Sequence, residues 1–164
     1  LTLADRIAVM NEGKLLQYDD VEKVYFNPNN TFVGWFLGNP GMNFINCIYR
    51  ELAGKRILDA RSFEYDASEV SFPKKLKNGE EVIAGVRPEY VNIDKEKKGK
   101  AISSVCEHIE PIGNRLLLRL RVKDQIIMAK TSTRIDVSEE DRVWIHFPSD
   151  QIRFFDKKTG SVII

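Results

Sequence analysis

The chain has 164 residues, of which 43% are hydrophobic and 30% charged, a composition typical of a soluble globular protein rather than a disordered or fibrous one. This length fits one ordinary domain, or a small barrel with an attached segment, and is long enough to bury a core. The formal net charge is only +1, which excludes a strong overall attraction to nucleic acid or anionic lipid.

The cysteine content and the hydropathy indicate a cytosolic protein without a membrane span. Cys47 and Cys106 are the only cysteines, and they lie far apart and outside any C-x-x-C spacing. No apolar run approaches the roughly 18 residues of a membrane-spanning helix, so we expect any membrane association to depend on partners. The sequence starts at Leu1, and residues 1–4 are typical of the end of a helix. We therefore expect a fragment of a longer protein.

Turn residues at positions 11–14 separate two short apolar runs, and this pattern predicts a β-hairpin over residues 7–18. The first strand of this hairpin needs a neighbouring sheet. Asp19, with Glu22 three residues later, is similar to a capping box and predicts a helix that runs to about Phe26, where an Asn-Pro pair stops it.

A second short helix is expected to begin at a Thr31 cap and to end at Gly38, in the position of a left-handed C-cap. Its apolar residues repeat at i to i+4 spacing, and Trp35 makes the segment apolar on nearly every side. A helix of this kind is normally buried on a larger body, and residues 1–40 offer little to bury it. We expect that body to lie upstream.

After an Asn-Pro-Gly boundary at residues 39–41, the pattern changes to short strands separated by turns, which predicts an all-β region. The clearest strand alternates apolar and polar residues over 116–123, and residues 143–147 repeat this alternation. Because closing a sheet removes aggregation-prone edges, we expect a small five-stranded OB-like barrel. The prolines expected at strand ends or edges are Pro88, Pro111 and Pro148.

Motifs for ATP hydrolysis or other catalysis are not found in the sequence. Each of the three Gly-Lys pairs lacks the earlier glycine and the following Ser or Thr of a phosphate-binding loop. There is no G-x-S-x-G motif, and His108 and His146 are the only histidines, so a Ser-His-Asp or Cys-His site would have few parts. The paired carboxylates lie in polar turns, where solvated charge is the ordinary state. We expect no catalytic residue.

Cysteine and histidine side chains are the candidate metal ligands. Cys106 and His108 are expected to share a strand face, and together with Cys47 they could ligate zinc. A metal site usually has four ligands at tighter spacings, however. We therefore expect packed strand residues and no metal site.

The strand face of Arg119, Arg121 and Lys123 is the best candidate for nucleic-acid binding, because OB barrels bind single strands through cationic grooves and stacking aromatic residues. No aromatic residue alternates with these three side chains. We therefore expect a solvated face or a protein contact, and no nucleic-acid partner.

The first 44 residues contain a set of landmarks, namely Leu3-Ala4-Asp5-Arg6-Ile7-Ala8-Val9-Met10-Asn11, Gly13, Gln17, Val24-Tyr25, Asn27-Pro28, Asn30, Phe32-Val33, Phe36-Leu37-Gly38, Pro40 and Met42-Asn43-Phe44. This set resembles the segment that follows the switch histidine in ABC-type ATPases of carbohydrate importers, up to the join between their ATPase and regulatory domains. One departure is that Asp19-Asp20-Val21 stands where the family commonly has Gly-Thr-Pro.

Three later groups resemble landmarks of the regulatory barrel in the same family. They are Gly85-Val86-Arg87-Pro88-Glu89, Glu110-Pro111-Ile112-Gly113-Asn114, and Phe154-Phe155-Asp156 with Thr159-Gly160. The resemblance implies a TOBE-type, OB-like regulatory domain of the maltose and glycerol-phosphate importer kind at residues 42–164. It also implies that residues 1–41 are the end of an ATPase domain.

On this resemblance, the chain would be the regulatory and dimerisation region of the ATP-binding subunit of an ABC importer for sugars or a related polar solute. The implied partners are a second copy of the chain, the upstream ATPase domain of the same chain, and membrane permease subunits at the cytoplasmic face of the membrane. ATP and Mg²⁺ would bind in the upstream part, because the family's Walker motifs precede the position of Leu1. The fragment itself would hold no cofactor.

Six residues are the candidates for regulation or interface contacts: Gly85, Arg87, Pro88, Glu89, Gly113 and Asn114. Arg87 is expected either to contact a carboxylate across an interface or to form a structural salt bridge at the strand end, with Glu89 as the candidate partner. Gly85 is expected to permit close backbone approach or a bulge, and Pro88 to end the ladder. Gly113 and Asn114 are expected to form a turn with positive φ rather than a ligand loop.

The alternative to a regulatory region is a stand-alone OB-like module that binds an oligonucleotide, an oligosaccharide or an oxyanion. A stand-alone enzyme is a third class, and it would need a convergent polar pocket of which the sequence gives no sign. The coding sequence upstream of Leu1 distinguishes the first two classes.

Overall fold

A computed structural model describes residues 4–163 of the chain. The expected helix end at residues 1–4 and the Leu3 landmark therefore fall outside the described part, apart from Ala4. The chain is 49% strand and 11% helix, which confirms the predicted mainly β class. Within residues 4–163, no helix has the length and apolar character needed to cross a membrane.

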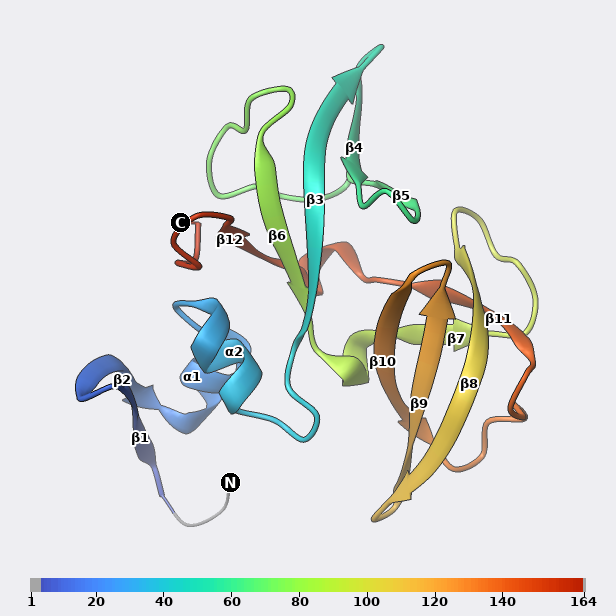
Figure 1. Ribbon diagram of the computed structural model, residues 1–164, viewed down its shortest axis with the longest axis horizontal. Helices are drawn as coiled ribbons and strands as arrows, with labels where there is room; N and C mark the ends of the chain where they lie inside the picture. The colour runs from blue at the N-terminus through green and yellow to red at the C-terminus, as the bar shows by residue number, and fades with distance from the viewer. Residues whose placement is uncertain (1–3, 164) are drawn as a thin grey trace.

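The N-terminal unit (residues 4–41) is a β-hairpin followed by two short helices, drawn in blue in Figure 1. Its elements are β1 (Arg6–Asn11), β2 (Lys14–Asp20), α1 (Val21–Phe26) and α2 (Thr31–Phe36). β1 and β2 pair antiparallel, so the predicted hairpin is confirmed. Glu12 and Gly13 at its turn both have positive φ, which matches the twist of the two strands.

The two predicted helix caps are wrong by one residue each. Asp20, the last residue of β2, rather than Asp19 precedes α1, and no side chain caps that helix. Asn30 rather than Thr31 caps α2, and its Oδ1 accepts a hydrogen bond from the Val33 N–H at 2.9 Å. Asn and Thr side chains both accept a hydrogen bond at a helix N-terminus, so residue type alone could not distinguish Asn30 from Thr31 as the cap.

Ten strands after the N-terminal unit form two antiparallel sheets of five strands each. The first sheet has the order β12-β6-β3-β4-β5 and contains β3 (Asn43–Leu52), β4 (Lys55–Asp59), β5 (Glu64–Asp66), β6 (Glu81–Val86) and β12 (Arg153–Asp156). The second has the order β10-β9-β8-β11-β7 and contains β7 (Asn92–Asp94), β8 (Ile102–Ile112), β9 (Arg115–Val122), β10 (Gln125–Ser132) and β11 (Arg142–His146). The 3₁₀ helices η1 (Pro88–Tyr90) and η2 (Ser149–Gln151) lie in connections between the sheets.

The predicted OB-like β fold is confirmed, but the expectation of a single five-stranded barrel is wrong. Figure 1 shows the first sheet at the top and the second at the lower right. β5 and β7 have three residues each, too few to display an alternating pattern in the sequence. The alternation of residues in the sequence therefore predicts fewer strands than the structure has.

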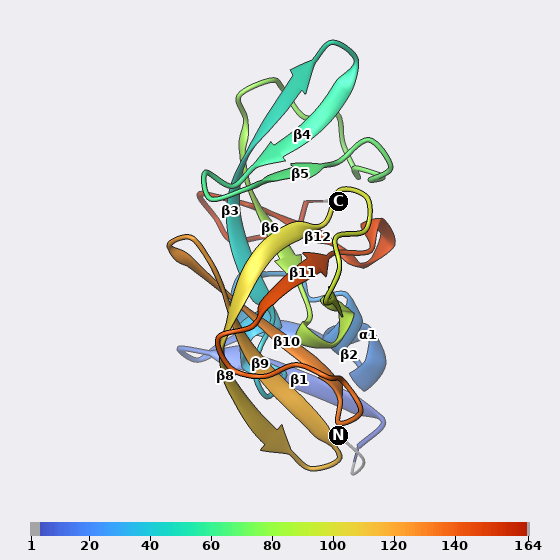
Figure 2. The ribbon, with the colours of Figure 1, turned by 90° about the vertical axis from the view of Figure 1, so that its right-hand side faces the viewer.

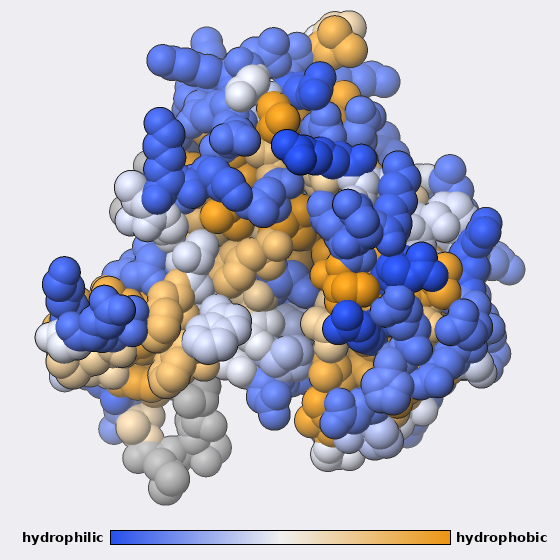
Figure 3. Space-filling model, in the orientation of Figure 1, coloured by the Kyte–Doolittle hydropathy of each residue, from blue (hydrophilic) through white to orange (hydrophobic). Residues whose placement is uncertain are grey.

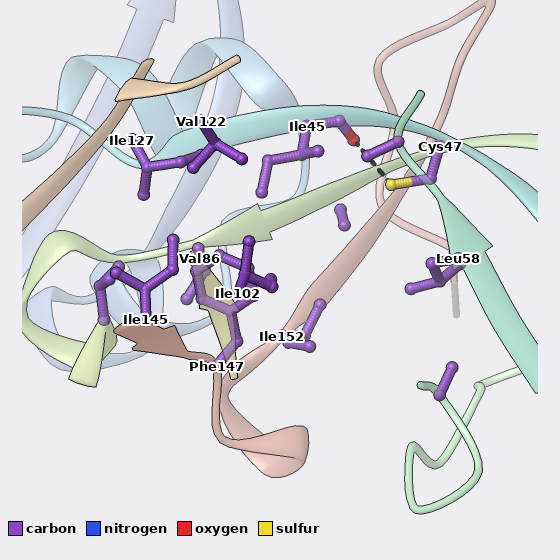
Figure 4. Close-up of a cluster of buried hydrophobic side chains, with 14 of the residues drawn as sticks. Ile45, Cys47, Leu58, Val86, Ile102, Val122, Ile127, Ile145, Phe147 and Ile152 are labelled. Atoms are coloured by element: carbon purple, nitrogen blue, oxygen red, sulfur yellow. Dashed lines mark hydrogen bonds between the residues drawn. The ribbon is translucent and has the colours of Figure 1, made fainter. Parts of the chain in front are cut away.

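One hydrophobic core joins the two sheets, as Figure 4 shows. Ile45 of β3 and Val86 of β6 lie in the same cluster as Ile127 of β10 and Ile145 of β11. The predicted alternation in β9 is confirmed from Leu118 to Val122, where buried apolar residues alternate with exposed arginines, but Leu117 is buried as well. Burying these aliphatic side chains is the main contribution to the stability of such a core.

The N-terminal unit has a separate small core made of Val9, Val24, Val33 and Leu37. Much of its other apolar surface is exposed, with Trp35 at 60% of its full accessibility. The exposed apolar side chains of the unit are Met10, Leu15, Tyr18, Phe26, Trp35 and Phe36. Figure 3 shows hydrophobic residues on the surface of this unit, at the left of the molecule.

The three prolines lie where the strand pattern predicts them. Pro88 begins η1 with one residue between it and the end of β6, and Pro148 precedes η2. Pro111 pairs with Leu116 near the end of β8, in a part of the strand to which β11 is not paired. None of the three removes a hydrogen bond from the middle of a sheet.

Candidate functional site

Arg87 joins the first sheet to the N-terminal unit. It is the bulkiest fully buried side chain among residues 4–163, with 2% exposure. Its Nη1 donates to the backbone carbonyls of Gly34, at 2.9 Å, and of Leu37, and its Nη2 donates to the carbonyl of Tyr25 at 2.6 Å. The guanidinium also lies over the Tyr25 ring, 3.9 Å from its centroid. We call this set of contacts the Arg87 junction.

The Arg87 junction satisfies backbone groups that short helices leave without partners. The last carbonyls of a helix have no intrahelical donor and carry partial negative charge. Tyr25 lies in the last turn of α1, and Leu37 is the C-cap of α2. One planar fork of five donors thus binds the ends of both helices, which a lysine could not do.

One of the two roles expected for Arg87, a structural salt bridge with Glu89 as the partner, is wrong, because among the described residues no carboxylate accepts a hydrogen bond from Arg87. Glu89 instead accepts a hydrogen bond from the Tyr25 hydroxyl at 2.5 Å. Burial, followed by this hydrogen bond, raises the pKa of the Tyr25 phenol well above its ordinary value. Burial also lowers the pKa of the Arg87 guanidinium.

Two glycines allow the close approach at the junction. A Cβ at Gly85 would lie 2.6 Å from the Met42 Sδ and 2.8 Å from the Phe155 Cε2, so the predicted close approach is confirmed. Gly38 follows the C-cap of α2 with a φ of +142°, and a Cβ there would lie 3.1 Å from the Arg87 Nη1. Only glycine adopts this backbone conformation without strain.

The end of the chain makes a second attachment to the N-terminal unit. The Thr31 N–H donates to the Gly160 carbonyl at 2.9 Å, and the Val162 N–H donates to the Asn29 carbonyl at 2.7 Å. A Cβ at Gly160 would lie 2.8 Å from the Thr31 Oγ1. The closing segment therefore adds to the contacts of the Arg87 junction in holding the unit.

The structure brings four of the six candidate site residues together and leaves two apart. Gly85, Arg87 and Glu89 take part in the junction or its packing, and Pro88 begins η1 between them. Gly113 and Asn114 form the turn between β8 and β9 at the lower tip of the second sheet in Figure 1. Gly113 has a φ of +58°, which confirms the predicted turn conformation.

The acceptors that Arg87 binds could not be identified from the sequence. They are main-chain carbonyls, so the side chains at those positions carry no signal for the contact. Tyr25 belongs to the Val-Tyr pair of the first landmark set, but nothing in that pair indicates Glu89 as its partner.

The candidate zinc ligands are separated by a β-bulge. The register of β8 shifts between Cys106 and His108, which buries Cys106 and leaves His108 exposed, so the expected shared face is wrong. His108 Nδ1 lies 2.7 Å from Glu139 Oε1. In residues 4–163, His, Cys, Asp and Glu form no group of three that could hold a metal ion.

The basic face of β9 is partly neutralised by an acidic neighbour. Arg119 Nε and Arg121 Nε donate to the two carboxylate oxygens of Glu107, at 3.2 and 2.6 Å. Lys123 lies in the turn after β9, with a φ of +55°. These contacts reduce the clustered positive charge on which backbone binding to nucleic acid depends.

Two family models match the chain. The MalK OB fold domain matches residues 38–91, and the TOBE domain matches residues 84–155. The matched ranges overlap at β6 and η1, the segment that holds Arg87. The fold and these matches thus define a module that combines an OB fold with a TOBE domain.

ABC transporter ATP-binding proteins resemble the chain over nearly its whole length. It is 31% identical to the uncharacterized ABC transporter ATP-binding protein YurJ of Bacillus subtilis, over 99% of this chain and 46% of that protein. It is 33% identical to the trehalose/maltose import ATP-binding protein MalK of Thermococcus litoralis, over 99% of this chain and 45% of that protein. The chain spans less than half the length of these relatives. It corresponds to the carboxy-terminal part of ABC importer ATP-binding proteins.

One solved structure shares the fold at low sequence identity. The cytoplasmic molybdate-binding protein ModG is 11% identical, with a TM-score of 0.50, over 68% of this chain and 94% of that chain. This likeness concerns the fold alone.

Proposed function

We propose that the chain is the regulatory and dimerisation region of the ATP-binding subunit of an ABC importer for sugars or a related polar solute. Its relatives include an oligosaccharides import protein of Bacillus subtilis and a xylose/arabinose import protein of Haloferax volcanii. On this proposal, residues 1–41 are the end of the ATPase domain and residues 42–164 are the regulatory domain. ATP and Mg²⁺ bind upstream, and the subunit is held at the cytoplasmic face of the membrane by permease subunits.

The Arg87 junction is the observation that carries this proposal. Arg87 is buried between the first sheet and the N-terminal unit and donates hydrogen bonds to the ends of two helices, so it couples the position of the two sheets to that of the N-terminal unit. A partner that moves the two sheets therefore also moves the N-terminal unit. Paired barrels would hold two subunits together while the nucleotide sites open, and an inhibitor would act by favouring the open state.

The exposed apolar face of the N-terminal unit supports self-association of the 164-residue chain. Trp35 and Phe36 are 60% and 56% exposed, and Phe36 stacks on Phe32 with ring centroids 5.6 Å apart. Exposed patches of this kind mark contact surfaces. We expect a dimer in equilibrium sedimentation, and replacing both Trp35 and Phe36 with Ser should shift it to monomer. A clean monomer of the unmodified chain at high protein concentration would contradict this expectation.

The direct test of the proposed function uses the full-length subunit in its importer. Deleting the region from Met42 onward should abolish regulation of transport and weaken subunit pairing, because the barrel region would be absent. The substitution Lys55→Ala, at an exposed position of β4, is the control that should leave both unchanged. Unchanged transport and regulation after the deletion would refute the proposed role.

A further inference from the structure

A cleft of about 810 Å³ opens between the two sheets, on the side of β5 and β7. It is lined by β5 and the loop after it, by η1 and β7, and by the ends of β9, β10 and β11. Figure 2 shows β5 above β11 on this side of the molecule. The volume lies within the roughly 300–1,000 Å³ that small-molecule sites occupy.

The charged side chains around the cleft balance one another. Four are cations and four are carboxylates, namely Lys98, Lys100, Arg115 and Lys130 against Asp66, Glu69, Glu89 and Asp94. Two opposite pairs are already bonded, Lys98 with Asp94 and Lys100 with Asp66. A wall without net charge does not concentrate an ion of either sign, so the cleft suits a neutral molecule.

The remaining lining supplies hydrogen-bonding groups and one aromatic ring. The uncharged polar side chains are Ser68, Asn92, Thr131, Ser132 and Ser149, and the imidazole ring of His146 also lines the cleft. The Tyr65 hydroxyl donates to the Phe147 carbonyl at 3.0 Å, which fixes the ring at the wall. Hydroxyl and amide groups both donate and accept hydrogen bonds, whereas lysine and arginine only donate them and carboxylates only accept them. This mixture matches a molecule that carries many hydroxyl groups on an otherwise apolar ring.

Two residues of the cleft also hold the N-terminal unit. Glu89 accepts the hydrogen bond from the Tyr25 hydroxyl in α1. Lys130 Nζ donates to the carbonyl of Asn39, in the linker before β3, at 2.7 Å. A molecule that bonds to Glu89 or Lys130 competes with these contacts. Occupancy of the cleft therefore acts on the attachment of the N-terminal unit.

We propose that this cleft binds a small neutral polyhydroxylated molecule of the sugar class, and that the bound molecule loosens the N-terminal unit through Glu89 and Lys130. The regulatory half of this inference rests on the proposed function, whereas binding in the cleft does not. Glu89 lines the cleft and accepts a hydrogen bond from Tyr25, whose carbonyl binds Arg87, so it connects the cleft to the junction from which the regulatory role is argued.

The experiment is isothermal titration calorimetry of the 164-residue chain with maltotriose and with trehalose. The variant Glu69→Ala/Arg115→Ala removes one exposed carboxylate and one exposed cation from the lining and preserves its charge balance. Saturable binding of at least one sugar, weakened at least tenfold in this variant, is the expected result. The matched control Lys55→Ala/Glu81→Ala changes two exposed charges outside the cleft and should bind as the unmodified chain does.

Three results would overturn the inference. They are an absence of saturable binding of both sugars, equal binding by the cleft variant and the control, and tighter binding of glucose 6-phosphate than of either neutral sugar. The regulatory half is measured separately, as faster amide hydrogen exchange in α1 with saturating sugar. Sugar binding without faster exchange in α1 would refute the loosening of the N-terminal unit but not the binding site. Neither result depends on the deletion experiment that tests the proposed function.

Discussion

Replacing Arg87 with Met should detach the N-terminal unit from the first sheet. Met keeps the apolar stem but removes the guanidinium, and the carbonyls of Tyr25 and Leu37 then have no other donor among the described residues. The Gly34 carbonyl keeps the Met42 N–H at 3.0 Å. Two buried unsatisfied acceptors cost about 1–3 kcal/mol each. Relief of the desolvation of a buried cation offsets part of this cost, so we expect a net loss of about 3 kcal/mol.

The loss should appear as local opening, because the N-terminal unit has its own small core. Amide hydrogen exchange in α1 and α2 should accelerate about a hundredfold, since each 1.4 kcal/mol is a factor of ten. Arg87→Lys should show most of the same effect, because a point charge cannot span the ends of both helices. Arg119→Met is the control, an exposed arginine paired with Glu107 whose loss costs less than about 1 kcal/mol. Unchanged exchange in α1 and α2 of Arg87→Met would refute the reasoning.

Three further predictions concern stability. Gly85→Ala should lower the free energy of unfolding in urea by about 1–3 kcal/mol, because the new methyl overlaps Met42, and the cost should shrink in a Met42→Ala background. Leu118→Ala should cost about 2–5 kcal/mol in the same assay because the side chain is fully buried, whereas Leu52→Ala, at a site 71% exposed, should change stability by less than about 0.5 kcal/mol. Thermal unfolding should shift to lower temperature as the pH falls from about 5 towards 3. Carboxylates such as Glu139 have a folded pKa below the unfolded one, so their stabilisation is present above the unfolded pKa and is lost as the pH falls through the folded pKa.

Each of these predictions has a contrary outcome. An unchanged cost of Gly85→Ala in the Met42→Ala background would show that the overlap is not the cause. Equal losses at Leu118 and Leu52 would contradict the assignment of the core. A melting temperature that stays constant between pH 5 and 3 would show that hydrogen bonds such as the one from the Ile109 N–H to Glu139 do not lower carboxylate pKa values in the folded chain.

Local signals predicted the regular elements well. The hairpin at the start has turn residues between two apolar runs, and β9 has eight residues with a clear period of two. The bulge between Cys106 and His108 could not be predicted, because one extra residue reverses the alternation without changing the composition. β5 and β7 gain their strand conformation from pairing with longer neighbours, and three residues carry no period of their own.

The candidate site could be predicted in part. The Gly85 to Glu89 landmark located the right segment, and the packing of Gly85 followed from its residue type. The hydrogen-bond partners of Arg87 could not be predicted from residue types, because the carbonyls of α1 and α2 reach it only through the tertiary fold. The charge balance of the cleft has the same origin, since its lining comes from segments between residues 65 and 149 that meet only in the tertiary fold.

The coding sequence directly upstream of Leu1 tests the central claim most directly. The account predicts a continuous reading frame that contains G-x-x-x-x-G-K-S/T, an ABC signature motif and a histidine shortly before Leu1. A start codon next to Leu1 would contradict it and would leave a stand-alone OB-like binding module.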